Sequence, residues 1–127
     1  MSDLIEMPDQ VADVFDGFQN AHAKVLRKAL ALILKEAKRL NVGPVTETLK
    51  WGQPSYAVRN GTPLRLGLLA ESPALFVHCQ TDIIENARAL IGGVAEFSGN
   101  RALILGGDPR AETHVICAAL IYHQRGA

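Results

Sequence analysis

Four short runs of strand-forming residues follow one another in the middle of the chain, and they constrain the fold more than any other feature. The runs cover residues 45–51, 55–59, 64–70 and 74–79. Only short turn-forming segments separate them, among them Asn60-Gly61, a strong hairpin signal because both residues tolerate positive φ. Such short connections join antiparallel neighbours, so the sequence predicts an antiparallel meander.

Residues with helical periodicity surround this central block. Apolar residues recur every three or four positions in the segments 8–18, 20–40, 82–92 and 109–124. A further strand is expected at 101–105, between the last two helices. Strands grouped together, with helices at both ends and one inserted, favour an α+β sandwich of two layers over a parallel α/β fold. We expect an antiparallel sheet of about five strands.

Capping residues mark several helix ends. Gly43 and Pro44 are expected to stop the second helix, because glycine accepts the left-handed cap and proline cannot continue a helix. Thr81 is expected to cap the third helix. Asp108 is expected to cap the fourth, which has Pro109 in its first turn.

Length and composition indicate one ordinary domain that covers residues 1–127. Of these residues, 48% are hydrophobic and 20% are charged, which suits a self-sufficient core. The formal net charge is +0, which disfavours a nucleic-acid partner bound through overall positive charge. The sequence names no other partner and leaves a homodimer open.

We expect a cytoplasmic protein without membrane contact. The acidic N-terminus lacks the basic and apolar regions of a secretory signal, and the longest apolar run, 29–34, is too short to span a bilayer. Cys79 and Cys117 are expected to be free thiols, as in a reducing compartment, with a single disulfide as the alternative.

The segment Glu47–Tyr56 carries a family resemblance. Its sequence, Glu-Thr-Leu-Lys-Trp-Gly-Gln-Pro-Ser-Tyr, resembles the signature of the YdhG-like family of small bacterial domains of unknown function. The order of helices and strands is similar to that family over nearly the whole chain. The resemblance implies a frataxin-like sandwich and, through one branch of the family, a link to iron delivery. It implies no catalytic residues.

Acidic residues recur on one face of the first helix and are candidate iron ligands. They are Glu6, Asp9, Asp13 and Asp16. Carboxylates three or four residues apart lie side by side on a helix, and their oxygens suit iron or other divalent cations. The same pattern is typical of a solvated helix face, or of a face that pairs with a basic neighbour.

Such a basic neighbour exists on the second helix. Its polar side carries Lys24, Arg27, Lys28, Lys35, Lys38 and Arg39. These cations could balance the acidic helix or stay solvated. They could alternatively bind an acidic protein or a phosphate backbone, which makes this helix a candidate interaction surface.

The start of the sheet holds a second candidate site, formed by Trp51, Gln53, Ser55 and Tyr56. An aromatic pair with amide and hydroxyl groups beside a turn could line a pocket for a small molecule or a peptide. The alternative is structural. Trp51 would then be a large buried anchor on the same strand face as Leu49.

Histidine and cysteine give only weak signals. His78 and Cys79 are neighbours on an expected strand and should point to opposite faces, so they cannot form a catalytic dyad. His114 and Cys117 could share a soft metal with either of them, although both cysteines also suit core positions.

No nucleophile, base and orienting group belong together in this sequence. We therefore expect a non-enzymatic binding or carrier domain, with iron at the acidic helix as the leading hypothesis. The segment Trp51–Tyr56 and the basic helix are the alternative binding surfaces.

Overall fold

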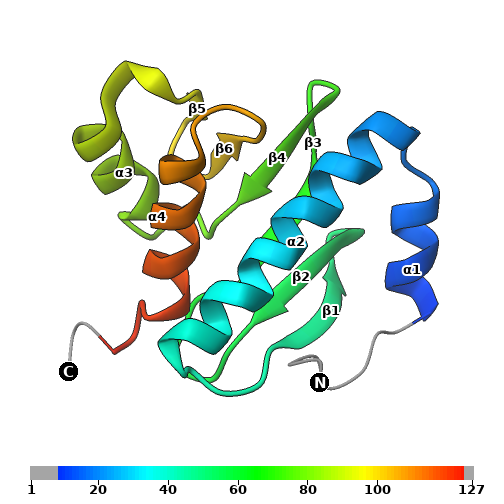
Figure 1. The fold of residues 1–127 in the computed structure, drawn as a ribbon, viewed down its shortest axis with the longest axis horizontal. Helices are drawn as coiled ribbons and strands as arrows, with labels where there is room; N and C mark the ends of the chain where they lie inside the picture. The colour runs from blue at the N-terminus through cyan, green and yellow to red at the C-terminus, as the bar shows by residue number, and fades with distance from the viewer. Residues whose placement is uncertain (1–8, 125–127) are drawn as a thin grey trace.

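Four α-helices cover one face of a six-stranded antiparallel sheet in the computed structural model, which describes residues 9–124 (Figure 1). The helices are α1 (Asp9–Asp16), α2 (Asn20–Leu40), α3 (Ile83–Ile91) and α4 (Pro109–Leu120), and a 3-10 turn, η1 (Gly92–Val94), follows α3. The strands are β1 (Thr46–Lys50), β2 (Gln53–Ala57), β3 (Leu64–Leu69), β4 (Ser72–Phe76), β5 (Phe97–Ser98) and β6 (Ala102–Ile104).

The α+β class and the antiparallel meander are confirmed. The strand order is β1-β2-β3-β4-β6-β5, so the first four strands are neighbours in sequence order. The expected count of five strands is wrong, because β5 pairs with β6 at the edge of the sheet. This strand has two residues, too few for alternation to reveal it in the sequence.

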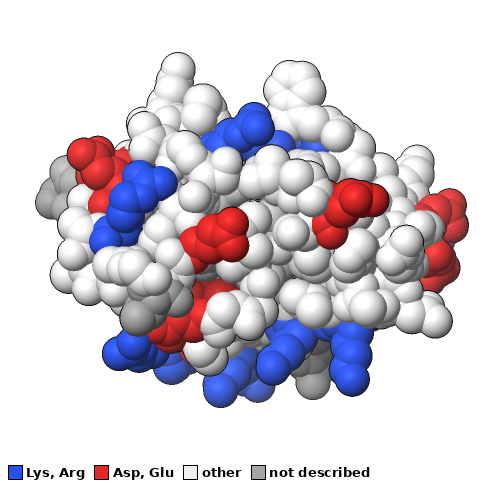
Figure 2. Space-filling model, turned by 90° about the horizontal axis from the view of Figure 1, so that it is seen from above, with Lys and Arg blue, Asp and Glu red and all other residues white. Residues whose placement is uncertain are grey.

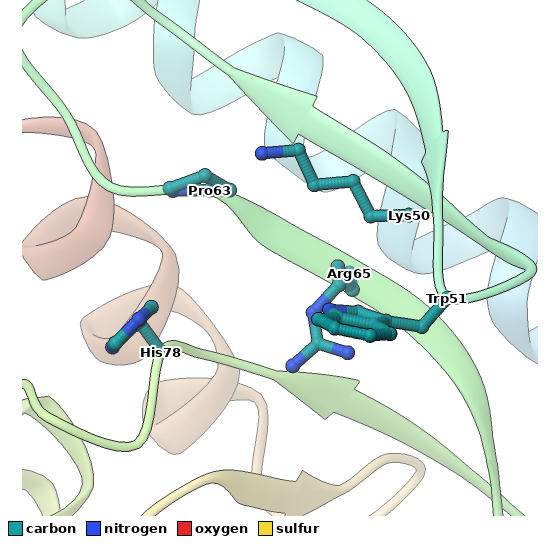
Figure 3. A pocket seen from close by; sticks show the side chains of 5 residues that line it. All are labelled: Lys50, Trp51, Pro63, Arg65 and His78. Carbon is teal, nitrogen blue, oxygen red and sulfur yellow. The ribbon is translucent and has the colours of Figure 1, made fainter.

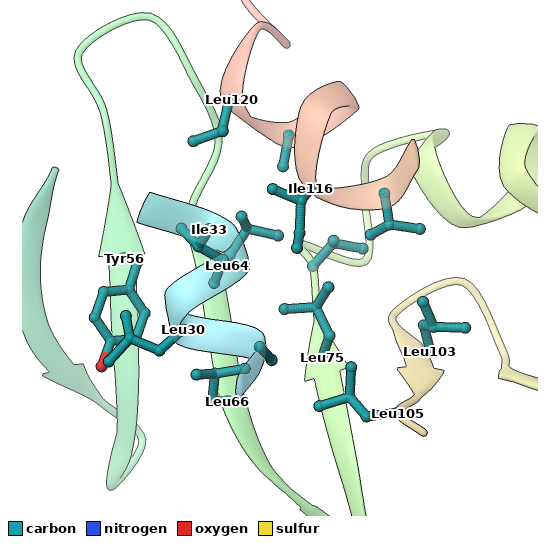
Figure 4. Close-up of a cluster of buried hydrophobic side chains, with 14 of the residues drawn as sticks. Leu30, Ile33, Tyr56, Leu64, Leu66, Leu75, Leu103, Leu105, Ile116 and Leu120 are labelled. Carbon is teal, nitrogen blue, oxygen red and sulfur yellow. The ribbon is translucent and has the colours of Figure 1, made fainter. Parts of the chain in front are cut away.

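The main core lies between the sheet and the helices. Alternate strand residues point toward the helices, where they meet the apolar stripes of α2 and α4 (Figure 4). The largest fully buried side chains are Phe15, Leu26, Ile33, Tyr56, Leu64, Leu66, Leu75, Ile83, Ile84, Leu103, Ile116 and Leu120. Each such burial stabilises the fold by roughly 1.5–3 kcal/mol, so this interface fixes how the helices sit on the sheet.

Two tight turns lie at the same end of the sheet. Trp51 and Gly52 join β1 to β2 with φ of 57° and 75°, and Ala70 and Glu71 join β3 to β4 with φ of 49° and 67°. β2 and β3 form the hairpin expected around Asn60-Gly61, but not through a tight turn, since neither residue has positive φ. That loop instead packs on the end of α4. A Cβ on Gly61 would lie 2.7 Å from the Ala119 carbonyl oxygen.

The helix ends agree with the sequence only in part. Asp108 caps α4 as expected, since its carboxylate accepts a hydrogen bond of 2.9 Å from the Arg110 backbone N–H. Asn41, with φ of 54°, rather than Gly43 is the left-handed cap of α2. The Thr81 hydroxyl donates to the His78 carbonyl instead of capping α3. Among the described helices, none is both long and apolar enough to cross a membrane.

The other face of the sheet carries a much smaller apolar cluster. Ala74, Phe76 and Ala102 are buried there, and Leu69 and Ile104 pack beside them. The strand register places Ser55, Arg65, Phe76 and Ala102 side by side in one row across this face. We call it the open face, because the four helices of the described chain lie on the opposite side (Figure 1).

Candidate functional site

Trp51 is the most exposed large hydrophobic residue of the described chain. It is 88% exposed and has φ of 57° in the β1–β2 turn. A left-handed conformation costs an ordinary L-residue roughly 1–2 kcal/mol, and Trp51 makes no buried packing that offsets this. The interpretation of Trp51 as a buried anchor is therefore wrong. The alternation of β1 ends at Lys50, and the turn begins one residue earlier than the sequence suggested.

A pocket of about 470 Å³ lies beside Trp51 on the open face. Its lining comes from separate parts of the sheet and its loops: Lys50, Trp51, Pro63, Arg65 and His78. We call it the open-face pocket. In Figure 3, Trp51 and Arg65 lie on one side of it, with Pro63 and His78 on the other. Small-molecule sites range over roughly 300–1,000 Å³, so this pocket is large enough for a ligand.

Arg65 is a fixed cation at this pocket. Its guanidinium donates a 2.9 Å hydrogen bond to Gln53 Oε1 and lies over the Phe76 ring, 5.6 Å from the centroid. It forms no salt bridge with any residue in the range 9–124. Burial lowers the pKa of Arg65, and the nearby cation Arg101 lowers it further, while the neighbouring Cys79 raises it by a smaller amount. The two lowering effects indicate a positive charge without a carboxylate partner in residues 9–124, which an anionic ligand would stabilise.

The side chain of Gln53, which accepts the hydrogen bond from Arg65, lies over Gly67 of β3. A Cβ at Gly67 would collide with the Gln53 side-chain amide, so only glycine allows this approach. Gln53 and Gly67 lie on neighbouring strands, β2 and β3. The Gln53 amide orients the Arg65 guanidinium through this hydrogen bond, although Gln53 is not one of the residues that line the pocket.

His78 offers the pocket a hydrogen-bond donor. Its Nδ1 accepts a hydrogen bond of 3.1 Å from the Gln80 backbone N–H. The proton of the neutral imidazole is therefore on Nε2, which can donate to a ligand. Together with Lys50 and Arg65, His78 makes a lining rich in donors. None of the five lining residues is acidic, so the pocket favours anions.

The four residues expected to form a site around Trp51 do not all come together. Gln53 and Ser55 lie on the open face, where Ser55 is 2% exposed and pairs with Arg65 in register. Tyr56 is fully buried on the helix side, opposite Glu47. The sheet therefore separates Tyr56 from the open-face pocket, because adjacent residues of β2 point to opposite faces.

The acidic stripe has little support as a metal site. Glu6 and the side chain of Asp9 lie outside what the structure describes. Asp13 and Asp16 are exposed, and Asp16 forms a 3.3 Å ion pair with Arg27. Within residues 9–124, no group of three or more histidine, cysteine, aspartate or glutamate side chains could hold a metal ion. Iron binding at this helix stays a prediction.

The basic side of α2 is exposed to solvent. Basic side chains gather along the lower edge of Figure 2, the side of the molecule on which α2 lies. Of the six cations, Arg27 pairs with Asp16 and Arg39 with Glu36, the latter at 2.7 Å. Charge balance with α1 thus accounts for Arg27 alone among the described residues.

The two cysteines are free and lie in different surroundings. Cys79 is exposed and follows His78 after β4. Cys117 on α4 donates a 3.2 Å hydrogen bond to the Glu36 carboxylate on α2, and the pKa of this thiol is raised by burial and by Glu36. This contact links two helices. The described residues do not form the soft-metal cluster that His114 and Cys117 were considered for.

Lys50, Pro63 and Arg65 were not among the site residues predicted from the sequence. One signal was present, since Arg65 is the single charged residue of the apolar run 64–70. This signal could not be interpreted from the sequence, because the strand register that places Arg65 beside Phe76 and Ser55 is not a local property. Comparisons with protein-family models, with curated proteins and with solved structures found no match. The YdhG-like resemblance of residues 47–56 therefore stays a prediction.

Proposed function

We propose that this protein is a binding domain that holds a small anionic ligand with a flat ring in the open-face pocket. One observation carries the proposal. Trp51 is exposed in a strained turn, and it lines the same pocket as Arg65, a cation that forms no salt bridge with the described residues. Strain that no packing offsets is typical of functional positions. The indole offers a stacking surface, and the guanidinium offers paired donors for a carboxylate or phosphate.

The chemistry of the lining supports binding rather than catalysis. The five residues provide cations, donors and apolar walls, but they do not include a serine or cysteine next to a base. Charge-assisted hydrogen bonds contribute about 1.5–3 kcal/mol each, and an aromatic contact contributes about 0.5–1.5 kcal/mol. Two of the former and one of the latter give affinities in the millimolar to micromolar range.

The proposal is tested by titrating the protein while its fluorescence is recorded, because Trp51 is the single tryptophan of the chain. Phenyl phosphate and benzoate are compared with benzyl alcohol and benzylamine, which keep the ring and lose or reverse the charge. We expect the two anions to change the Trp51 emission in a saturable way. Equal responses to all four compounds would contradict the proposal.

Two arginine variants make the test specific. Arg65→Gln removes the hydrogen-bonded cation of the pocket and leaves Lys50, so it should strongly weaken the response to anions. Arg88→Gln is the matched control, because Arg88 on α3 also lies over a ring, Phe97, at 5.4 Å, but does not line the pocket. This control should bind like the wild type.

Three expectations from the sequence remain separate proposals: the frataxin-like arrangement of the sandwich, the cytoplasmic location, and iron binding. The decapeptide 47–56 supports the first, and the acidic residues of the first helix support the last. Titration of Fe(II) and Fe(III) into wild type and an Asp9/Asp13/Asp16→Asn variant tests iron binding. Equal weak binding by both proteins would remove it.

A further inference from the structure

We infer that the anionic ligand of the open-face pocket is a free nucleoside monophosphate, with its base against Trp51 and its phosphate at Arg65. The inference rests on the proposed function and narrows it from any ring-bearing anion to one chemical class. Three observations support it: the positive charge of the residues that line the pocket, the exposed indole of Trp51, and the volume of the pocket.

The positive charge at the pocket suits a phosphate better than a carboxylate. Lys50 and Arg65 line it as cations, and His78 can add a donor from Nε2. Arg101 is a further cation close to Arg65. A phosphate monoester carries about −1.5 to −2 charges at pH 7 and three acceptor oxygens, whereas a carboxylate carries one charge and two oxygens. The fork of a guanidinium also matches two phosphate oxygens.

The indole of Trp51 supplies the surface for a base. Because it is 88% exposed, most of its area is free for stacking. Stacking of one base on an aromatic side chain is worth roughly 5- to 150-fold in affinity, and it tolerates different bases because each has a flat face. Pro63 adds an apolar wall on the opposite side of the pocket (Figure 3).

The size and the surroundings of the pocket favour one nucleotide over a nucleic-acid strand. Its volume of about 470 Å³ lies in the lower half of the range for small-molecule sites. Proteins that bind single strands use several aromatic side chains along a basic groove. Here Trp51 is the one exposed large aromatic residue in the described chain, and Phe76 is 5% exposed beneath Arg65. The basic side of α2 lies on the other face of the sheet.

Calorimetric titration separates the alternatives. The ligands are adenosine monophosphate, adenosine, inorganic phosphate, benzoate and a single-stranded deoxyadenosine hexamer. We expect the monophosphate to bind at least about tenfold more tightly than adenosine or phosphate, since only it uses both the indole and the cations. Benzoate should also be weaker, because it lacks the second charge.

Three variants test whether the base of the ligand contacts Trp51 and whether its phosphate contacts Arg65. Trp51→Ala should weaken the monophosphate by about tenfold and leave inorganic phosphate unchanged. Arg65→Gln should weaken both. Arg65→Lys keeps the charge but loses the fork, and it should lie between Arg65→Gln and wild type. Thermal melts of each variant show that it is folded before its affinity is compared.

The possible failures are distinguishable. Benzoate binding as tightly as the monophosphate would overturn the nucleotide inference and leave the proposed function standing. A hexamer that binds more tightly than the monophosphate would overturn it in favour of a strand. If none of the five ligands binds, and phenyl phosphate also leaves Trp51 unchanged, both the inference and the proposed function fall.

Discussion

At the scale of single residues, Trp51 combines an unfavourable backbone conformation with the binding role proposed for its indole. With Gly52 it forms a tight turn in which both residues have positive φ, the arrangement that Asn-Gly prefers. We predict that Trp51→Asn raises the free energy of unfolding by about 1 kcal/mol, or the Tm by about 3–6 °C, and weakens ligand binding about tenfold, as expected for Trp51→Ala. Thermal melts and calorimetric titration measure the two effects.

The other tight turn provides the matched control for Trp51→Asn. Ala70 also has positive φ, at 49°, but it does not line the open-face pocket. Ala70→Asn should therefore stabilise the protein by a similar amount and leave binding unchanged. A loss of stability in Trp51→Asn would instead mean that the indole has a structural role.

Glu47 is a buried carboxyl group whose oxygens have no hydrogen bond of good geometry to any described residue. Burial raises the pKa of Glu47, while Tyr56 opposite it partly offsets this effect. The folded protein therefore keeps this proton to higher pH than the unfolded chain does. Stability is lost as the pH rises from about 4.3, the pKa of an unperturbed glutamate, through the raised value.

We predict that Glu47→Gln stabilises the protein by roughly 1–3 kcal/mol at pH 8, because it removes a buried charge that Tyr56 stabilises only in part. At pH 3, below both pKa values, the variant and the wild type should be equally stable. Urea unfolding at several pH values measures this difference, and Glu85→Gln at an exposed position of α3 is the control. A gain that does not depend on pH would contradict the explanation.

At the scale of elements, a contact between β2 and β3 fixes the position of Arg65 at the open-face pocket. Gly67 lets Gln53 lie on the strand, and Gln53 in turn holds Arg65. We predict that Gly67→Ala displaces Gln53 and weakens ligand binding several-fold, while it changes stability by at most about 1 kcal/mol. Gly93→Ala is the control, since a Cβ there meets open space. Unchanged affinity in Gly67→Ala would show that Arg65 does not need Gln53.

The helices and strands also show how much of the secondary structure the local sequence patterns predicted. The runs of apolar periodicity predicted four helices, and their positions are confirmed within a few residues. Alternation predicted the first four strands, but the strand ends shifted because turns depend on single residues. The β1–β2 turn begins at Trp51, so Gln53 and Pro54 belong to β2. No local pattern marks a residue such as Trp51 for a left-handed turn, which bulky residues rarely adopt.

At the scale of the whole molecule, the two concentrations of positive charge lie on opposite sides of the sheet. The cations of α2 are on the helix side, and the open-face pocket is on the other. The Debye length is about 8 Å at physiological ionic strength, so the two should act independently. We predict that reversing Lys24, Lys28 and Lys35 to glutamate leaves ligand affinity within about twofold at 0.15 M salt. Calorimetry measures it.

A strong loss of affinity in this triple variant would mean that the ligand reaches α2, which the sheet should prevent. Capture of an acidic protein by wild type but not by the triple variant would give the basic side of α2 a role of its own. These two outcomes concern different faces of the molecule, so one set of proteins tests both.

Sequence alone determined the class of this fold, because apolar periodicity is a local property that repeats along each helix and strand. It also predicted the Asp108 cap and the antiparallel order of the first four strands. Only the tertiary structure decided which residues meet. The register sets Arg65 between Ser55 and Phe76, and the turn at Trp51 leaves the indole in solvent beside them. Pairing across strands is non-local, and one residue of shift exchanges the two faces of a sheet.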